Sequence, residues 1–296
     1  MTRNDIFMPK VTKKTLNCRG RLVDLTQPAV MGILNATPDS FFSGSRLTTD
    51  NSPSAKAIEL AHQMLDDGAT FLDIGGYSTR PGAATVSPSE EADRVLPVIE
   101  AILSEFPDAI ISIDTFRASV ARQAVTAGAA LINDVSGGSL DPDMFSTVAE
   151  LSRSQSTPYI LMHIRGTPQT MQSLATYKHV TTEVIDELAT RLAELRALGL
   201  KDVILDPGFG FAKTPAQNFE LLNQLDAFGL FDEPILVGLS RKTTIWKTLN
   251  ISPDKALNGT TVLNTAALLK GASILRVHDV REAVEAVQLT QRLTFF

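Results

Sequence analysis

Residues 203–210 read VILDPGFG: a short apolar run, an aspartate at its end, and then a glycine-rich turn. A short run with β-branched members that is bounded by Pro and Gly predicts a strand buried on both faces. A carboxylate at the tip of such a strand needs partners, because stripping a charge of water costs several kcal/mol. Asp206 is therefore either a structural turn former or a group that waits for a ligand, and the same design recurs along the chain.

Short apolar runs alternate with helical patterns, which indicates βα units and a parallel sheet. Several runs follow a glycine that ends the preceding helix, as in GATFLDIGG and GAALINDV. The eight runs span residues 30–36, 71–76, 109–114, 131–135, 158–163, 203–208, 234–240 and 274–279. Eight units in about 250 residues predict an α/β fold, a closed (β/α)8 TIM barrel. An open doubly wound sheet is the alternative, but NATPDSFF after Leu34 is not the G-x-G-x-x-G that it requires.

The ends of several helices can also be read from the sequence. Ser52-Pro53 predicts a helix start that Gly68 ends, and Asp141-Pro142 predicts another start. Further C-cap glycines are expected at Gly128, Gly199 and Gly271. Before the first unit, LNCRGRLVDL predicts a β-hairpin that caps the bottom of the barrel. We therefore divide the chain into an N-terminal extension with this hairpin (1–28) and a single catalytic domain (29–296).

Composition and charge exclude several classes of function. No stretch approaches the roughly 20 apolar residues that cross a bilayer, and the first residues contain no apolar h-region, so we expect a soluble cytoplasmic protein. The single cysteine, Cys18, excludes an internal disulfide and a multi-thiolate metal site. A net charge of −6 argues against a nucleic-acid partner held by bulk electrostatics. Any phosphate must be held by a few placed cations.

Polar residues stand at all eight strand ends, where a TIM barrel forms its active face. They are Asn35, Asp73 with Gly75-Gly76, Asp114, Asn133-Asp134, His163, Asp206, Ser240 with Arg241-Lys242, and Arg276 with His278. Each alone has a structural interpretation: Asp114 can cap the next helix, and a lone histidine is more often a satisfied core residue. Eight polar ends on one face indicate a functional site, although less strongly for His163 and Asp134.

The polar residues fall into two chemical groups. Asp114, Asn133 and Asp206 offer acceptors and one amide, which suit a flat heterocycle with neighbouring N–H groups. Cations suited to phosphate or pyrophosphate are Arg80, Lys242, Arg276 and His278. Asn35 supplies a neutral oxygen that can bind Mg²⁺ when phosphate and water complete the shell. The substrate is expected to carry both a heterocycle and an anion.

Two loops have the composition of lids that exclude water during a reaction. The first, NATPDSFFSGSR (35–46), places Phe41 and Phe42 between a proline and a glycine. The second, GGYSTRPGAATVSP (75–88), contains Arg80. Paired aromatic residues in a polar loop can also be satellite contacts of the core.

With these motifs, the chain resembles the dihydropteroate synthase family of the folate pathway from about residue 15 to 290. The matching stretches are MGILNATPDSF, FLDIGGYSTRPGA, ISIDTFR, LINDVSGG, YILMHIRGTPQTMQ, VILDPGFGFAKT, LVGLSRK and NGTTVLNTAALLKGASILRVHDVREA. The resemblance implies a TIM-barrel transferase that joins 6-hydroxymethyl-7,8-dihydropterin pyrophosphate to p-aminobenzoate, giving 7,8-dihydropteroate and pyrophosphate. It also implies Mg²⁺ as cofactor, small-molecule substrates only, and a homodimer formed through helices late in the barrel.

The resemblance further implies a role for each matching position. The pterin residues would be Asp114, Asn133, Asp206, Lys242, Met162 and Val135. The pyrophosphate residues would be Asn35, Arg80, Arg276 and His278, with Asn35 also binding Mg²⁺. The p-aminobenzoate residues, where sulfonamides are expected to compete, would be Thr79, Pro81, Phe41, Phe211, Ser240 and Lys242. The catalytic residues would be Asp114, Lys242, Arg276 and His278.

Pyrophosphate leaves readily only when its developing charge is neutralised, so we expect departure before attack by the amine, with Asp114 offsetting the positive charge on the pterin.

The competing interpretations are a pterin-dependent methyltransferase domain and a non-catalytic pterin-binding relative. A methyltransferase has no use for SRK (240–242) or RVH (276–278). Loss of Arg80, Lys242 or the Arg276 and His278 pair would mark a non-catalytic relative, and all are present. SFFSGSR (40–46) departs from the Asp-Gly-Gly-like stretch of many relatives, which leaves the role of Phe42 open.

Overall fold

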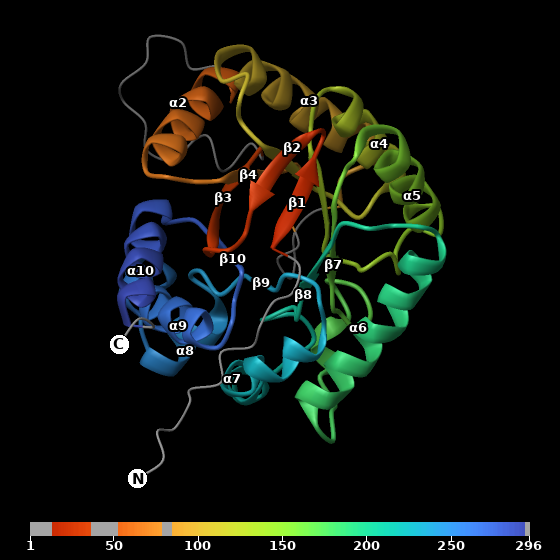
Figure 1. Ribbon diagram of the computed structural model, residues 1–296. Coiled ribbons are helices and arrows are strands. Elements are labelled where there is room, and N and C mark those ends of the chain that lie inside the picture. Colours follow the sequence, from red (N-terminus) through yellow and green to blue (C-terminus); the bar gives the residue numbers. More distant parts are fainter. Residues whose placement is uncertain (1–13, 37–52, 79–84, 294–296) are drawn as a thin grey trace.

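The computed structural model describes residues 14–36, 53–78 and 85–293. Eight parallel strands form a barrel that helices surround, as Figure 1 shows. The sheet order is β8-β7-β6-β5-β4-β3-β10-β9, and a bridge between Leu205 and Ile235 joins its two ends. The predicted (β/α)8 fold is confirmed. The strands are β3 (Ala29–Asn35), β4 (Phe71–Gly75), β5 (Ile111–Asp114), β6 (Leu131–Asp134), β7 (Tyr159–Met162), β8 (Val203–Asp206), β9 (Leu236–Val237) and β10 (Ile274–Val277).

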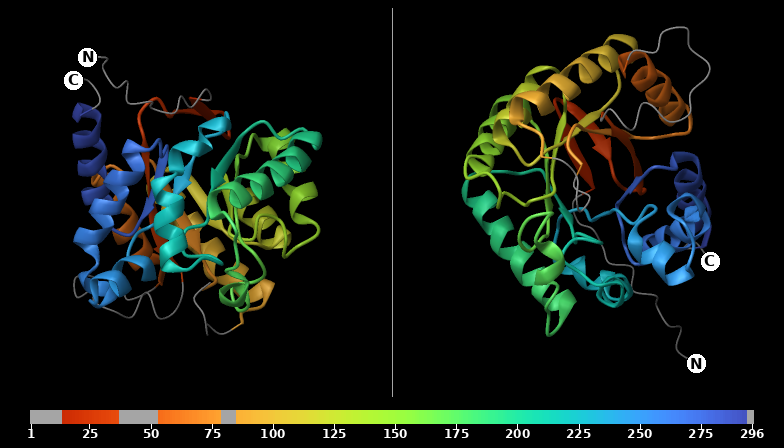
Figure 2. Two further views of the ribbon diagram at one scale, coloured as in Figure 1. Left: turned by 90° about the horizontal axis from the view of Figure 1, so that it is seen from below. Right: turned by 180° about the vertical axis from the view of Figure 1, so that it is seen from behind.

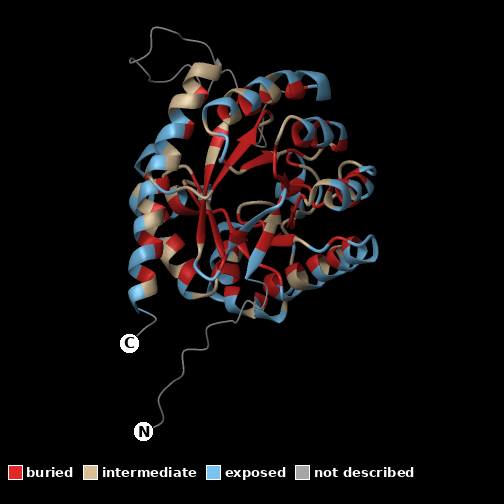
Figure 3. Ribbon diagram, turned by 45° about the horizontal axis from the view of Figure 1, so that its top comes forward, coloured by how far each residue is buried: buried red, intermediate tan, exposed pale blue. Residues whose placement is uncertain are grey.

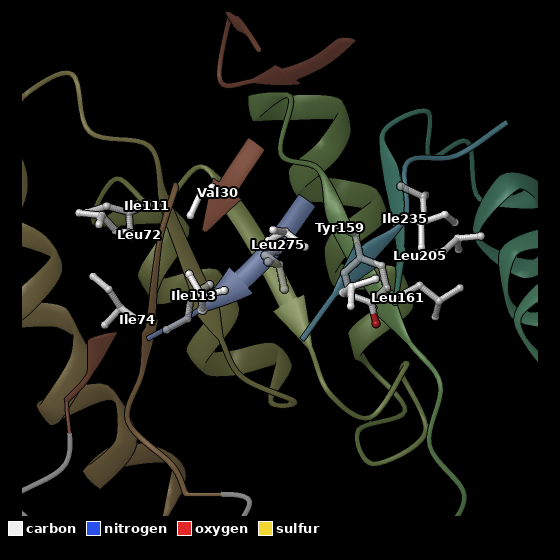
Figure 4. Close-up of a cluster of buried hydrophobic side chains, with 14 of the residues drawn as sticks. Val30, Leu72, Ile74, Ile111, Ile113, Tyr159, Leu161, Leu205, Ile235 and Leu275 are labelled. Carbon is white, nitrogen blue, oxygen red and sulfur yellow. The ribbon is translucent and has the colours of Figure 1, made fainter. Parts of the chain in front are cut away.

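The outward faces of the strands are largely apolar, because they pack under the helices. Side chains alternate between the two faces of a strand. Figure 4 shows one set of these residues from strands around the barrel, including Leu72, Ile113, Leu161 and Leu205. They belong to one buried cluster with helical residues such as Ile99. Burial on both faces explains why the strands read as continuous apolar runs.

The inward face changes character along each strand. At the amino ends, Met31, Phe71, Leu131 and Ile274 form an apolar layer inside the barrel. Two positions further along the same strands, the inward residues are Ile33, Asp73, Asn133 and Arg276. The period of two in strand geometry thus places a layer that is polar on β4, β6 and β10 directly above an apolar one.

The predicted N-terminal hairpin closes the apolar end of the barrel. Strand β1 (Thr15–Cys18) pairs antiparallel with β2 (Arg21–Asp24) around Arg19 and Gly20, both at positive φ. Leu16, Cys18 and Val23 join the apolar layer of the barrel interior. The side view in Figure 2 shows the hairpin across one end of the barrel. Among the described residues, the hairpin therefore covers the amino ends of the strands.

The helices lie outside the barrel, with their outer faces exposed and their inner faces buried (Figure 3). No helix among the described residues is both long and apolar enough to cross a membrane. The helices are α2 (Pro53–Asp66), α3 (Pro88–Glu105), α4 (Ala118–Thr126), α5 (Met144–Gln155), α6 (Val180–Ala197), α7 (Pro215–Asn223), α8 (Thr243–Leu249), α9 (Leu257–Leu269) and α10 (Val280–Leu293), with 3₁₀ turns η1 (Met171–Leu174), η2 (Leu225–Leu230) and η3 (Pro253–Lys255).

Three of the helices end at a glycine that the sequence predicts. Gly128, Gly199 and Gly271 follow helices at φ values of 120°, 88° and 95°, which confirms the predicted C-cap glycines. Helix α5 begins at Met144, two residues after Pro142. One oxygen of the Asp141 carboxylate accepts the backbone N–H of Ala118 at the start of α4 (2.8 Å), and the other accepts that of Asp143 (3.0 Å), so a turn precedes α5.

Candidate active site

A cavity of about 490 Å³ opens at the carboxyl ends of the strands. Its walls come from β3, β5, β10 and the loops after β4, β8 and β9, so residues far apart in sequence meet there. Seven of the predicted site residues line it: Asn35, Asp114, Phe211, Ser240, Lys242, Arg276 and His278. The cavity therefore brings the predicted anion-binding residues that the structure describes together with two of the six predicted pterin residues, Asp114 and Lys242.

Arg276 forms the electrostatic centre of the cavity floor. Its Nε lies 2.6 Å from Oδ2 of Asp73, and its Nη2 lies 2.6 Å from Oδ2 of Asp114. The two carboxylates hold the pKa of Arg276 above its ordinary value, although burial opposes them. Burial raises the pKa of Asp114 to about 7, and the charge of Arg276 limits that rise. One guanidinium thus joins β4, β5 and β10.

The predicted heterocycle residues present acceptors. Asn133 donates its amide N–H to Oδ2 of Asp73 at 2.9 Å, which leaves its Oδ1 as the free acceptor end of the amide. Asp206 accepts the backbone N–H of Gly208 at 2.7 Å through one oxygen. Burial raises the pKa of Asp206, and the charge of Lys242 opposes the rise. Together with Asp114, these groups suit a ligand edge that carries N–H donors.

Lys242 is held from both sides. Its Nζ donates to the backbone carbonyl of Phe209 and lies 4.8 Å from the centre of the Phe211 ring. Burial lowers the pKa of Lys242 to about 8, and the carboxylate of Asp206 opposes that shift. The preceding residue, Arg241, has φ +52° and binds Asp279 with both Nε (2.9 Å) and Nη2 (2.8 Å). This bidentate pair fixes the turn that aims Lys242 into the cavity.

Ser240 and His278 orient each other at the rim. The Ser240 hydroxyl accepts the backbone N–H of His278 at 3.1 Å and lies 3.0 Å from the imidazole Nδ1. The Ser240 hydroxyl therefore holds the imidazole of His278 at its Nδ1.

Four predicted pterin residues, Asn133, Asp206, Met162 and Val135, are buried on the strands beside the cavity and do not line it. Phe41, Thr79, Arg80 and Pro81 lie outside the described residues, as do most of the two predicted lids.

Asp134 and His163 do not face the cavity. Asp134 accepts from Tyr159 Oη and from the backbone N–H groups of Ser136 and Gly138, all at 2.7 Å. His163 contacts Glu187 on α6 and Lys213. Each residue directly follows an inward-facing strand residue, so its own side chain points outward, away from the cavity. The contacts of Asp134 and His163 are therefore structural.

Sequence reasoning noted Asp73 at a strand end but gave it no role, and it missed Tyr77 and Trp246, which line the cavity. Asp73 is fully buried and holds both Arg276 and Asn133. Its position two residues after the inward-facing Phe71 was a usable signal. Trp246 lies one helical turn after Lys242, and the i, i+4 spacing could have placed it on the same side.

Comparisons with known proteins agree with this geometry. Residues 31–278 match the family described as pterin binding enzyme. Dihydropteroate synthase of Escherichia coli strain K12 is 42% identical over 278 residues, covering 93% of this chain and 95% of that protein.

Two solved structures of Xanthomonas albilineans dihydropteroate synthase share the fold. The structure with 4-aminobenzoic acid has a TM-score of 0.86 and 37% identity, covering 96% of this chain and 100% of the other. The structure in complex with 7,8-dihydropteroate has a TM-score of 0.83 and 34% identity, covering 95% and 99%. The family match, the near full-length coverage by relatives and the shared barrel all agree. The chain therefore belongs to the dihydropteroate synthase family of pterin-binding enzymes.

Proposed function

We propose that this chain condenses 6-hydroxymethyl-7,8-dihydropterin pyrophosphate with p-aminobenzoate, releasing pyrophosphate and 7,8-dihydropteroate. The observation that carries the proposal is the Arg276 guanidinium, which joins an acceptor group (Asp73, Asp114 and the neighbouring Asn133) to the cationic wall of one cavity. Relatives named for this activity align over nearly the whole chain. Neither the methyltransferase nor the non-catalytic interpretation has comparable support.

The pterin ring would bind deep in the barrel, with its N–H groups on Asp114, Asn133 and Asp206. Support comes from the orientation of the Asn133 amide, which Asp73 holds with the oxygen as the free end. Met162 at the end of β7 and Val135 directly after β6 would line the ring faces, because both are buried beside the strands that carry Asn133 and Asp206. Lys242 would reach the ring from above.

The pyrophosphate would lie in the cavity against Arg276 and His278, with Arg80 joining from its loop. Mg²⁺ would be held by Asn35, which lines the same cavity. The described residues contain no group of three His, Cys, Asp or Glu that could hold a metal. The donor set therefore fits an ion that takes one protein oxygen and completes its shell with phosphate oxygens and water, as Mg²⁺ commonly does. When bound, Mg²⁺ would neutralise charge on the leaving group.

The p-aminobenzoate would lie at the outer side of the cavity, between Phe211, Ser240 and Lys242, with Phe41, Thr79 and Pro81 closing over it. A related solved structure contains 4-aminobenzoic acid. The ammonium of Lys242 suits the carboxylate or the aromatic face of that substrate.

The reaction then needs little from the protein except placement and charge. The C–O bond to pyrophosphate breaks, and Arg276, His278 and Lys242 offset the developing negative charge. The carboxylate of Asp114 offsets the positive charge left on the pterin methylene. The aniline nitrogen forms the new C–N bond and loses a proton to solvent. No side-chain nucleophile takes part, and Cys18, whose pKa burial raises to about 12, lies at the closed end of the barrel.

The test is pyrophosphate release from dihydropterin pyrophosphate with Mg²⁺, with and without p-aminobenzoate, for the wild type and for Asp114→Asn. Release that depends on p-aminobenzoate and yields dihydropteroate in the wild type supports the proposal. An at least tenfold lower rate in Asp114→Asn would support the role of Asp114. A wild type that binds the pterin substrate and never turns over would establish the non-catalytic alternative.

We further propose a cytoplasmic homodimer that joins through α9. Val262 on α9 is 58% exposed and Leu269 is 41% exposed, so the helix carries apolar side chains that the barrel does not bury. Cys18 is an unpaired thiol, as is usual in a reducing compartment. Light scattering should give twice the chain mass, and Val262→Asp should shift it toward the monomer. A monomeric wild type would contradict the proposal.

A further inference from the structure

Lys213 is a buried lysine that the proposed mechanism does not use. Its side chain is 3% exposed, and it lies in the loop between β8 and α7, which we define as residues 207–214. A buried ammonium is stable only when partners replace its water shell. The partners of Lys213 therefore show what the residue does.

Lys213 uses all three of its donors. Its Nζ lies 3.0 Å from the carbonyl oxygen of Gly208, 3.1 Å from that of Phe211 and 2.9 Å from Nδ1 of His163. A lysine ammonium has three N–H donors and no acceptor, so the three bonds saturate it. Two of the bonds connect residues within the loop, and the third connects the loop to His163, directly after β7.

This arrangement defines the protonation of His163. Nδ1 must accept from Lys213, so the ring proton resides on Nε2, which lies 3.0 Å from Oε2 of Glu187. Burial lowers the pKa of His163 to about 4, which agrees with a neutral ring. Glu187 in turn pairs with Arg165. The loop is thus connected to α6 through the buried His163 and the half-buried Glu187.

The anchored backbone is the part that holds Lys242. Phe209 lies between the two residues whose carbonyls Lys213 binds. The carbonyl oxygen of Phe209 accepts a hydrogen bond from Nζ of Lys242. Phe211 places its ring 4.8 Å from the same Nζ. Ala212, directly before Lys213, has φ +49°, a conformation that a non-glycine residue keeps only when its surroundings hold it.

We propose that Lys213 is a positioning residue that shapes residues 207–214 around its ammonium and so holds Lys242 and Phe211 in place for the amine substrate. The inference rests on the proposed function, because it concerns the p-aminobenzoate side of the cavity. Two of the three proposed pterin acceptors, Asp114 and Asn133, lie on β5 and β6, away from this loop, whereas Asp206 ends β8 directly before it. Loss of Lys213 should therefore affect p-aminobenzoate more than the pterin substrate.

Lys213→Met keeps the length of the side chain and removes its donors. We expect the KM for p-aminobenzoate to rise about tenfold, with less than about a threefold change for the pterin substrate. Lys201→Met, an exposed lysine before the same strand, is the matched control and should match the wild type. Burial lowers the pKa of Lys213 to about 7, so the variants and the wild type are compared at one fixed pH.

Two variants of His163 test the anchor without removing Lys213. In His163→Asn, the side-chain oxygen can accept from Lys213 near the position of Nδ1, whereas His163→Leu offers no acceptor. The asparagine variant should keep the wild-type KM for p-aminobenzoate, and the leucine variant should show the rise seen in Lys213→Met. A purely structural role would lower the melting temperature of both variants without this difference.

The outcomes separate the two proposals. A wild type without turnover would remove the proposed function, whatever the variants do. An active wild type beside a Lys213→Met enzyme with both KM values unchanged would overturn the positioning role. Equal KM values for p-aminobenzoate in the two His163 variants would also overturn it. If Lys213→Met does not fold, the comparison of the two His163 variants is the deciding test.

Discussion

The carboxylate of Asp73 and the guanidinium of Arg276 are 203 positions apart in sequence and form an ion pair of 2.6 Å across the barrel interior. The same carboxylate oxygen accepts the amide of Asn133, so one buried acid organises a cation and an amide of the cavity floor. Asp73 is fully buried and carries no assigned contact with substrate. Its role is to position the groups that have one.

Asp73→Asn should lower kcat/KM about a hundredfold, which corresponds to about 2.7 kcal/mol. The neutral amide cannot pair with Arg276, and breaking a buried charge pair costs about 2–5 kcal/mol. Steady-state kinetics of the condensation measure the effect, and Asp66→Asn on the exposed face of α2 is the control. A value of kcat/KM for Asp73→Asn within threefold of the wild type would show that Asp73 is dispensable.

The pH profile of kcat/KM should be bell-shaped, because this quantity reports groups of the free enzyme. The rate is expected to rise as pH passes about 7, where Asp114 becomes the carboxylate, and to fall above about 8, where Lys242 loses its proton. Asp114→Asn should remove the rising limb and keep the falling limb. An unchanged rising limb in that variant would assign it to another acid.

Tyr159→Phe should destabilise the protein by about 1–3 kcal/mol and leave kcat/KM within about twofold of the wild type. The lost hydroxyl is the 2.7 Å donor to Asp134, which is buried on the outward side of β6. Urea unfolding and kinetics measured on the same preparation check both parts. A tenfold loss of activity at unchanged stability would place Asp134 in the catalytic site instead.

Gly208→Ala should destabilise the protein more than Gly199→Ala, by at least about 2 kcal/mol. Both glycines have positive φ, so both substitutions strain the backbone by about 1–2 kcal/mol. A methyl group at Gly208 would lie 2.0 Å from the carbonyl oxygen of His163, whereas nothing lies within 4 Å of the corresponding position at Gly199. Equal unfolding free energies for the two variants would mean that β7 and the loop after β8 separate at little cost.

Much of the fold was readable because its signals are local. The eight strands, the hairpin around Arg19-Gly20 and the C-cap glycines depend on residues within a few positions of each other. Strand alternation is equally local: Asp134 follows Asn133 directly, so the two must point to opposite faces. That rule, applied residue by residue, separates the inward Asn133 from the outward Asp134.

The sequence by itself determined the barrel, the hairpin at its lower end and the face on which the polar residues gather, because each follows from periodicity, turn residues and the ends of parallel strands. Only the tertiary structure decided which polar groups bind each other. Arg276 reaches Asp73 and Asp114, and Lys213 reaches His163, because barrel closure brings distant strands together. Such pairs depend on distances between strands far apart in sequence, and no local pattern records them.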